Sequence, residues 1–79
     1  MYRYYDHQYH DVANNKILSS LTNKQKEAIL LANKLGYYNY PRRVSISQLS
    51  KIMGISKTTT IEHLRRAEKT IMGLVLNGN

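Results

Sequence analysis

The chain has 79 residues, no cysteine and a formal net charge of +7, and these three properties narrow its possible functions. The length suits one small domain, which buries only about 60 to 65% of the surface that its unfolded chain would expose. Without cysteine the chain can hold neither a disulfide nor a thiolate metal site. No apolar run approaches the roughly 18 residues of a membrane span, so the sequence predicts a cytoplasmic protein with no membrane association.

The positive charge is concentrated in the second half of the chain. Residues 1–20 sum to zero and residues 21–41 to +2, whereas residues 42–69 sum to +5. Clustered Lys and Arg side chains attract phosphate groups over long distances. The distribution indicates a polyanionic partner, although a generic solubilising excess would give the same total.

Residues 1–20 read as an N-terminal arm or a short extra helix. The stretch "YRYYDHQY" fits an arm that lies on DNA or on a partner chain, and it fits a disordered end equally well. The following "DVANNKILSS" can form a short helix with Val12, Ile17 and Leu18 as its apolar contacts. The "DHQYHD" stretch at residues 6–11 would bring two His and two Asp together only if it were helical, so we expect no metal site.

The first strong helix signal begins at Thr22 and ends at Gly36. Gln25 follows Thr22 by three residues, the capping-box spacing that satisfies free backbone N–H groups at a helix start. Gly36 is suited to the left-handed conformation that follows a helix end. The apolar face of this helix consists of Ala28, Ile29, Ala32 and Leu35.

The same start signal recurs at Ser45 and Gln48, and it predicts a second helix of about eight residues that ends at Gly54. Ser56 then caps a third helix, which we expect to run from Lys57 to about Met72. The predicted apolar face of the second helix consists of Ile46, Leu49, Ile52 and Met53.

Only the residues "GIS" connect these two helices. So short a turn makes the helices cross steeply, as in a helix-turn-helix motif. Gly54 allows positive φ in this turn, Ile55 fills the angle between the helices, and Ser50 is small enough to let them approach closely.

The third helix has two distinct sides at about 100° per residue. Its predicted buried stripe consists of Thr60, Leu64, Ala67 and Ile71. Its predicted exposed face consists of Thr58, Glu62, Arg65, Arg66 and Lys69. Such a face is often merely solvated. Here, however, the helix that carries it follows a helix-turn-helix turn, and helix-turn-helix motifs touch base edges with the first turns of this helix.

These elements predict an all-α fold, a small three- to four-helix bundle that contains a helix-turn-helix. Residues 21–79 form the predicted DNA-binding domain, and the chain after the third helix is too short for a β-wing. The terminal "IMGLVLNGN" is too apolar to stay in water, so it either covers the first helix or meets a second copy of the chain. We expect a homodimer, formed through this segment or through the N-terminal arm.

Residues 21–71 resemble the helix-turn-helix domain of the bacterio-opsin activator family of archaeal transcription regulators. The resemblance is carried by the "LT" start of the first helix, "GYYNYPRR" in the linker, "GIS" in the turn and "EHLRRAE" in the third helix. It implies a transcription regulator that binds double-stranded DNA, with "KTTTIEHLRR" in the major groove. The chain departs from the family pattern at Thr60, where the family has an apolar residue; Ile61 is its neighbour.

The linker before the second helix reads as a phosphate clamp. Pro41 stiffens the chain just ahead of Arg42 and Arg43. The free N–H groups and the dipole at the start of the second helix favour an anion at the same place. The residues that we expect to contact phosphate are Arg42, Arg43, Ser45, Ser47, Ser56, Arg66 and Lys69.

The first turns of the third helix carry the expected base readers. Lys and Arg suit guanine, a carboxylate suits the cytosine amino group, and Thr or Ile suits a thymine methyl. The residues that we expect to contact bases are Lys57, Thr58, Thr59, Ile61, Glu62 and Arg65.

Two other binding functions remain open, and enzymatic function is disfavoured. A basic helical adaptor for an acidic protein of the transcription machinery would carry the same charge, and RNA binding fits less well because an RNA helix has a narrow major groove. The chain has no cysteine nucleophile, no phosphate-cradling glycine loop and no convincing carboxylate pair. We therefore expect no catalytic residues and no cofactor.

Overall fold

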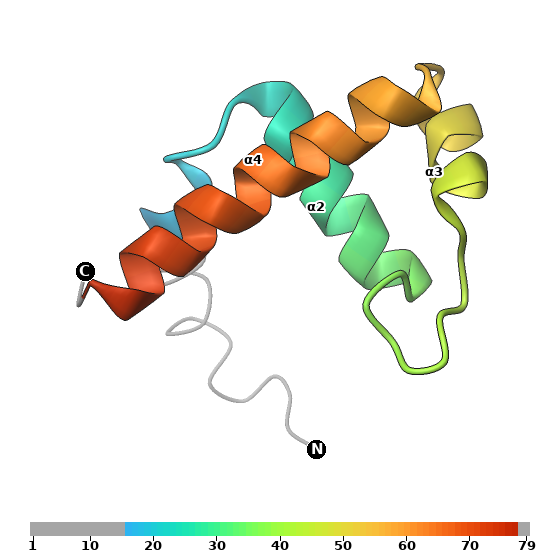
Figure 1. The fold of residues 1–79 in the computed structure, drawn as a ribbon. Helices are drawn as coiled ribbons and strands as arrows, with labels where there is room; N and C mark the ends of the chain where they lie inside the picture. Colours follow the sequence, from blue (N-terminus) through green and yellow to red (C-terminus); the bar gives the residue numbers. More distant parts are fainter. Residues whose placement is uncertain (1–15, 78–79) are drawn as a thin grey trace, which may run out of the picture.

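The structure is a computed structural model that describes residues 16–77. Its helices are α2 (Asn23–Leu35), α3 (Ile46–Met53) and α4 (Lys57–Leu76), preceded by a helical turn at residues 16–18. Figure 1 shows α4 lying across α2, with α3 beside the start of α4 and a long linker between α2 and α3. No part of residues 16–77 is a strand, which confirms the predicted all-α fold without a β-wing. None of the helices in this range is long and apolar enough to cross a bilayer.

The boundaries of α2 follow its end signals. The side chain of Thr22 accepts a hydrogen bond from the backbone N–H of Gln25, and the Gln25 side chain accepts one from the backbone N–H of Thr22. Gly36 takes the left-handed conformation with φ of 92° and donates its N–H to the last turn of α2. Both predicted boundaries are therefore confirmed.

The turn between α3 and α4 is the predicted helix-turn-helix turn. Gly54 has φ of 72°, and Ser56 caps α4 by accepting from the N–H of Thr59. Ile55 packs against the core, and the hydroxyl of the buried Ser50 donates to the carbonyl of Ser47. Because the Ser50 hydroxyl is satisfied within α3, Ser50 can be buried without an unpaired polar group.

The core lies where the three helices meet. Thr60 lies there with an exposure of 0%, and its hydroxyl donates to the carbonyl of Ser56 at 2.8 Å. Since that hydrogen bond satisfies the hydroxyl, Thr60 can occupy a buried position on α4. The buried cluster consists of Ala28, Ala32, Val44, Leu49, Met53 and Leu64.

Three sequence expectations about the helices need correction. Ile52 is 56% exposed, so the buried side of α3 is narrower than the predicted face and excludes it. Helix α4 continues to Leu76 rather than ending near Met72, because Gly73 stays helical and Asn77 donates its N–H to the Gly73 carbonyl. Ile71 in the predicted buried stripe is only half-buried, whereas the rest of the stripe is buried.

The linker between α2 and α3 folds back on Gly36, the residue at which it begins. The carbonyl of Gly36 accepts from the N–H groups of Asn39 and Arg43, at 3.2 and 2.9 Å. The Tyr40–Pro41 peptide bond is cis, a feature that the sequence analysis did not predict. These contacts bring Arg43 directly over Gly36.

We predict that Gly36→Ala destabilises the fold more than Gly54→Ala. Both glycines have positive φ, which costs a residue with a Cβ about 1 to 2 kcal/mol. A Cβ at Gly36 would also lie 2.7 Å from the Cβ of Arg43, whereas a Cβ at Gly54 meets nothing within 4 Å. Urea denaturation of both variants measures the two losses, and equal losses would contradict the close packing of Arg43 on Gly36.

Candidate nucleic-acid interface

The first half of α4 exposes a polar face on the side away from its buried stripe. Thr58, Glu62 and Arg65 are exposed, and Ile61 is half-buried beside them. Together with Arg66 these side chains line one shallow hollow. The structure therefore brings together four of the six expected base readers.

The remaining two expected base readers lie at the start of α4. Lys57 is exposed in the first turn, and Thr59 is half-buried. The hydroxyl of Ser56 donates to the hydroxyl oxygen of Thr59 at 2.8 Å. This bond engages the hydroxyl hydrogen of Ser56, so Ser56 is less suited to donate to a phosphate than the sequence analysis expected.

The linker cations lie on a second hollow next to the first. Its lining includes Arg42, Arg43 and Ser45 from the region before α3 and Ile61 from α4. Because Ile61 lines both hollows, the linker and the exposed face of α4 form one continuous surface. We call this surface, with Arg42, Arg43, Thr58, Ile61, Glu62 and Arg65 as its members, the reading surface.

Arg42 is held in place by an aromatic ring. Its guanidinium lies over the ring of Tyr37, 4.0 Å from the ring centroid, which is a cation–π contact. A stacked guanidinium keeps its N–H groups at the rim, where they can donate to a phosphate.

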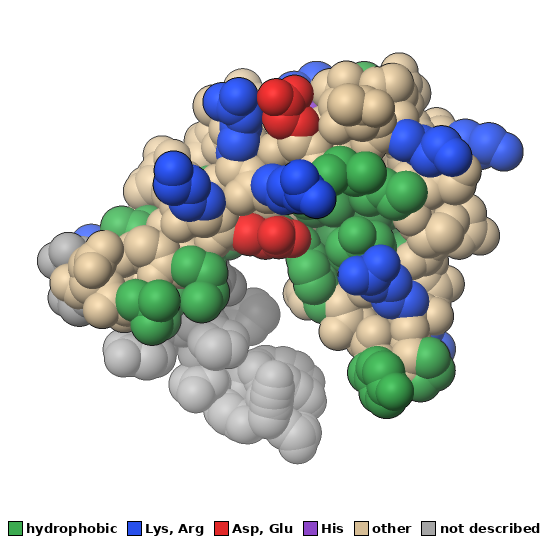
Figure 2. Space-filling view, viewed as in Figure 1, with side chains coloured by type: hydrophobic (Ala, Val, Ile, Leu, Met, Phe, Trp, Pro, Cys, Tyr) green, Lys and Arg blue, Asp and Glu red, His purple; other side chains and the backbone are tan. Residues whose placement is uncertain are grey.

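Figure 2 shows basic side chains distributed around an apolar patch on this side of the molecule.

The serines before and within α3 are partly used by the fold. Ser45 caps α3 by accepting from the N–H of Gln48, and its own hydroxyl hydrogen remains able to donate. Ser47 is half-buried, and its carbonyl accepts from Ser50. Ser47 does not line the hollows that form the reading surface, so its expected phosphate contact has the least support.

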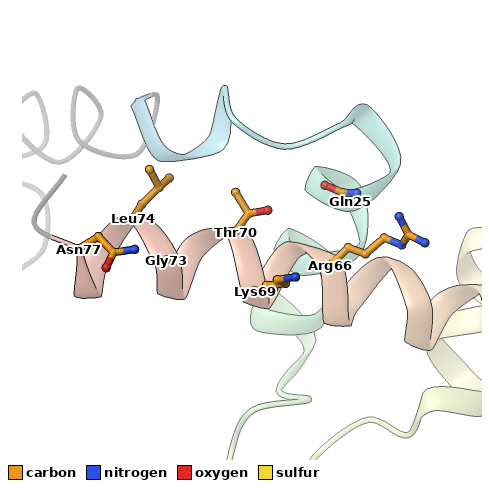
Figure 3. Close-up of a pocket in the computed structure, with 7 residues that line it drawn as sticks. All are labelled: Gln25, Arg66, Lys69, Thr70, Gly73, Leu74 and Asn77. Atoms are coloured by element: carbon orange, nitrogen blue, oxygen red, sulfur yellow. The ribbon is translucent and has the colours of Figure 1, made fainter.

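Lys69 lies apart from the reading surface, in a groove between the second half of α4 and the start of α2. Figure 3 shows this groove, in which Lys69 and Arg66 share the wall with Gln25. Arg66 also makes an exposed ion pair with Glu62, with 3.3 Å between Nη2 and Oε2. The expected phosphate contacts therefore form two groups, one in the linker and one on this flank of α4.

The sequence analysis missed a contact between the linker and α4. The hydroxyl of Tyr38 donates to the carboxylate of Glu68, and the rings of Tyr37 and Tyr38 meet edge to face with centroids 5.1 Å apart. Partial burial of the hydroxyl, followed by the hydrogen bond to Glu68 and its negative charge, raises the pKa of Tyr38 above its usual value. Tyr38 therefore remains a hydrogen-bond donor at neutral pH.

No periodicity could have linked these two residues, because they are 30 positions apart on different elements. Each lies in a string that the sequence analysis singled out, Tyr38 in "GYYNYPRR" and Glu68 in "EHLRRAE". The two strings therefore supply the two partners of a tertiary contact, and they also carry candidate DNA contacts.

Residues 16–77 contain no group of three His, Asp or Glu side chains that could hold a metal ion. The "DHQYHD" and "YRYYDHQY" stretches precede this range, so the expectations made for them are not tested. Ile17 and Leu18 of the proposed extra helix lie in the described turn and are half-buried.

Comparison with known proteins identifies related transcriptional regulators. The "Dimethyl sulfoxide reductase transcriptional activator" of Haloferax volcanii is 42% identical over 60 residues, which are 76% of this chain and 28% of that protein. The protein of the same name from Halobacterium salinarum is 39% identical over 54 residues, 68% of this chain and 24% of that protein. The "Transcriptional regulator NarO" of Haloferax volcanii is 28% identical over 57 residues, 72% of this chain and 27% of that protein.

The chain thus spans about a quarter of the length of each of these curated relatives. No solved structure matches it significantly. A family model described as a helix-turn-helix DNA-binding domain matches residues 21–73. This is a family of DNA-binding domains and not of enzymes. The chain belongs to the family of helix-turn-helix DNA-binding domains of the bacterio-opsin activator type.

Proposed function

We propose that this chain is a sequence-specific transcription regulator that places α4 in the major groove of double-stranded DNA. The observation that carries this proposal is the reading surface, where the exposed side of α4 adjoins the cations of the linker. An α-helix fits the major groove of B-form DNA, where each base pair presents a distinct pattern of donors and acceptors. The names of the relatives support a role in transcription but do not supply the target genes of this chain.

The proposed base readers divide by chemistry. Arg65 and Lys57 suit the acceptors of guanine, Glu62 suits the amino group of cytosine, and Thr58 and Ile61 suit the methyl group of thymine. Thr59 is the sixth proposed reader, although its hydroxyl oxygen already accepts from Ser56. The half-buried Ile61 lies between the two hollows, a position from which an apolar side chain can meet a base.

The proposed phosphate contacts surround these readers. Arg42 and Arg43 come from the linker, and Arg66 and Lys69 come from the flank of α4 that faces α2. Ser45, Ser47 and Ser56 complete the set, with hydroxyls in or near the caps of α3 and α4. Two groups of cations on either side of α4 suit the two phosphate backbones that border a major groove.

A homodimer is the proposed functional unit. One side of the last turns of α4 faces α2, since the half-buried Leu74 and Gln25 of α2 line the same groove. The other side exposes Met72, Val75 and Leu76 by 52, 59 and 73%. An apolar side on a helix end is suited to an isologous contact with a second copy. Two-fold symmetry would set the two recognition helices about 34 Å apart.

The proposed organisation keeps residues 1–20 as a separate arm or extra helix ahead of the DNA-binding domain at residues 21–79. The matched range of the family, residues 21–73, is compatible with that division. As a DNA-binding regulator of archaeal type, the protein is proposed to act in the cytoplasm.

Selection of bound sequences from a random duplex pool tests the proposal most directly. We expect an enriched motif arranged as an inverted repeat, with half-site centres one helical turn apart. A single half-site without a repeat would contradict the homodimer but not sequence-specific binding. Weak binding without any enriched motif would favour the adaptor for an acidic protein partner.

We predict that Arg65→Ala and Arg43→Ala change DNA binding in different ways. Loss of a base contact at Arg65 should cost about 1 to 3 kcal/mol on the selected sequence and much less on other sequences. Loss of a phosphate contact at Arg43 should weaken all sequences alike, and it should flatten the log–log salt dependence by about one phosphate equivalent. Fluorescence anisotropy at several salt concentrations, on selected and scrambled duplexes, measures both effects.

The unfolding midpoint of each variant serves as the control for folding. Equal weakening on the selected and scrambled duplexes by Arg65→Ala would show that Arg65 does not read a base. A change in sequence preference caused by Arg43→Ala would contradict its assignment to phosphate.

A further inference from the structure

We propose that Tyr38 is a positioning residue for DNA recognition, because its hydroxyl engages the Glu68 carboxylate and so keeps that carboxylate from pairing with Arg65. The inference rests on the proposed function, in which Arg65 reads a base. It assigns to a linker residue an effect on Arg65 that passes through Glu68.

Glu68 lies within reach of the cations of the reading surface. It lines one small hollow together with Arg42, Arg65, Ile61 and other side chains of the linker and α4. Arg65 and Glu68 are three positions apart on α4, a spacing at which side chains of opposite charge can pair along a helix. The same hollow admits Arg42, so the Glu68 carboxylate has two cations nearby.

Glu68 nevertheless makes no ion pair with any residue in the range 16–77. The ion pairs in that range are Lys24 with Glu27 and Arg66 with Glu62. The carboxylate of Glu68 accepts from the Tyr38 hydroxyl instead. Glu62 provides the comparison on the same helix, since this carboxylate pairs with its neighbouring arginine.

The linker holds Tyr38 in the position that this contact requires. The backbone N–H of Tyr37 donates to the carbonyl of Ala32 at the end of α2, at 2.8 Å. The Tyr37 ring then meets the Tyr38 ring edge to face and carries the Arg42 guanidinium on its face. Arg42 is thus stacked on a ring and makes no ion pair with Glu68, and the carboxylate accepts from the Tyr38 hydroxyl rather than pairing with Arg65.

Removal of the hydroxyl should release the carboxylate to Arg65. An exposed ion pair between Arg65 and Glu68 is weak. Because it would compete with the base for the Arg65 guanidinium, it should lower the affinity for the selected duplex by about two- to fivefold. The loss should appear in the ratio of affinities for the selected and scrambled duplexes, because Arg65 reads a base. A purely structural loss would instead appear in the unfolding midpoint and on both duplexes.

The test compares Tyr38→Phe, Glu68→Gln and the double variant in the full chain at constant salt. We expect Tyr38→Phe to lower the affinity ratio two- to fivefold and the double variant to restore it, because a glutamine amide cannot form an ion pair with Arg65. Glu68→Gln alone should keep the wild-type ratio, since the amide oxygen still accepts from Tyr38. Tyr40→Phe is the matched control, because that hydroxyl belongs to the same linker and Tyr40 is 101% exposed.

The outcomes separate this inference from the proposed function. If Arg65→Ala lowers the ratio but Tyr38→Phe leaves it unchanged, or the double variant fails to restore it, the inference is wrong and base reading by Arg65 stands. If Arg65→Ala itself leaves the ratio unchanged, base reading by Arg65 is wrong and the inference falls with it.

A second measurement tests the contact without DNA. The ultraviolet titration of the wild-type chain minus that of Tyr38→Phe isolates the ionisation of the Tyr38 hydroxyl. In the Glu68→Gln background the pKa of Tyr38 should move down toward its ordinary value of about 10, because the opposing negative charge is gone. The same pKa in both backgrounds would overturn the inference, since Glu68 would then not be the acceptor in solution.

Discussion

Burial of one side of α4 is the constraint on which the rest of the structure depends. Thr60, Leu64 and Ala67 are buried where α4 crosses α2 and α3. A helix whose buried stripe is fixed in this way cannot rotate without exposing apolar surface to water. Each Å² of apolar surface exposed costs a free energy of about 25 cal/mol. The exposed face of α4 is therefore fixed by its buried side, and with it the set of side chains that the proposed interface offers to DNA.

The core that provides this constraint is small, and short-range contacts support it. The buried positions of α2 are both alanine, Ala28 and Ala32, which allow a close approach of the crossing helix. Each helix of the motif begins with a side-chain cap, and α2 and α3 each end at a glycine with positive φ. A cap contributes about 1 kcal/mol, so the helix ends form a substantial part of the stability of so small a domain.

The linker between α2 and α3 belongs to the proposed interface as much as α4 does. It closes on itself at Gly36, stacks Arg42 on Tyr37 and reaches α4 through Tyr38. Glu62, a member of the reading surface, pairs with Arg66, and the neighbouring Glu68 accepts from the hydroxyl of Tyr38. Within residues 16–77 neither carboxylate makes an ion pair with Arg65, which leaves Arg65 available to a ligand in the proposed interface.

Local signals in the sequence determined the helices and the turn. Capping pairs such as Ser45 with Gln48, and glycines at helix ends, act over three or four residues, so their meaning did not depend on the rest of the fold. Helical periodicity likewise predicted the buried core of α4 and the exposed position of Arg65. The family resemblance added the expectation of DNA binding, which the matched family confirms.

Tertiary packing decided what these local signals left open. Ile52 has the periodicity of a core residue yet is exposed, because the neighbouring helices cover only part of α3. The pairing of Tyr38 with Glu68 likewise depends on segments far apart in the chain. A single sequence records which side chains are present and how they repeat along an element. It does not record which distant side chains meet, because those contacts are set by the crossing of whole helices and the path of the linker between them.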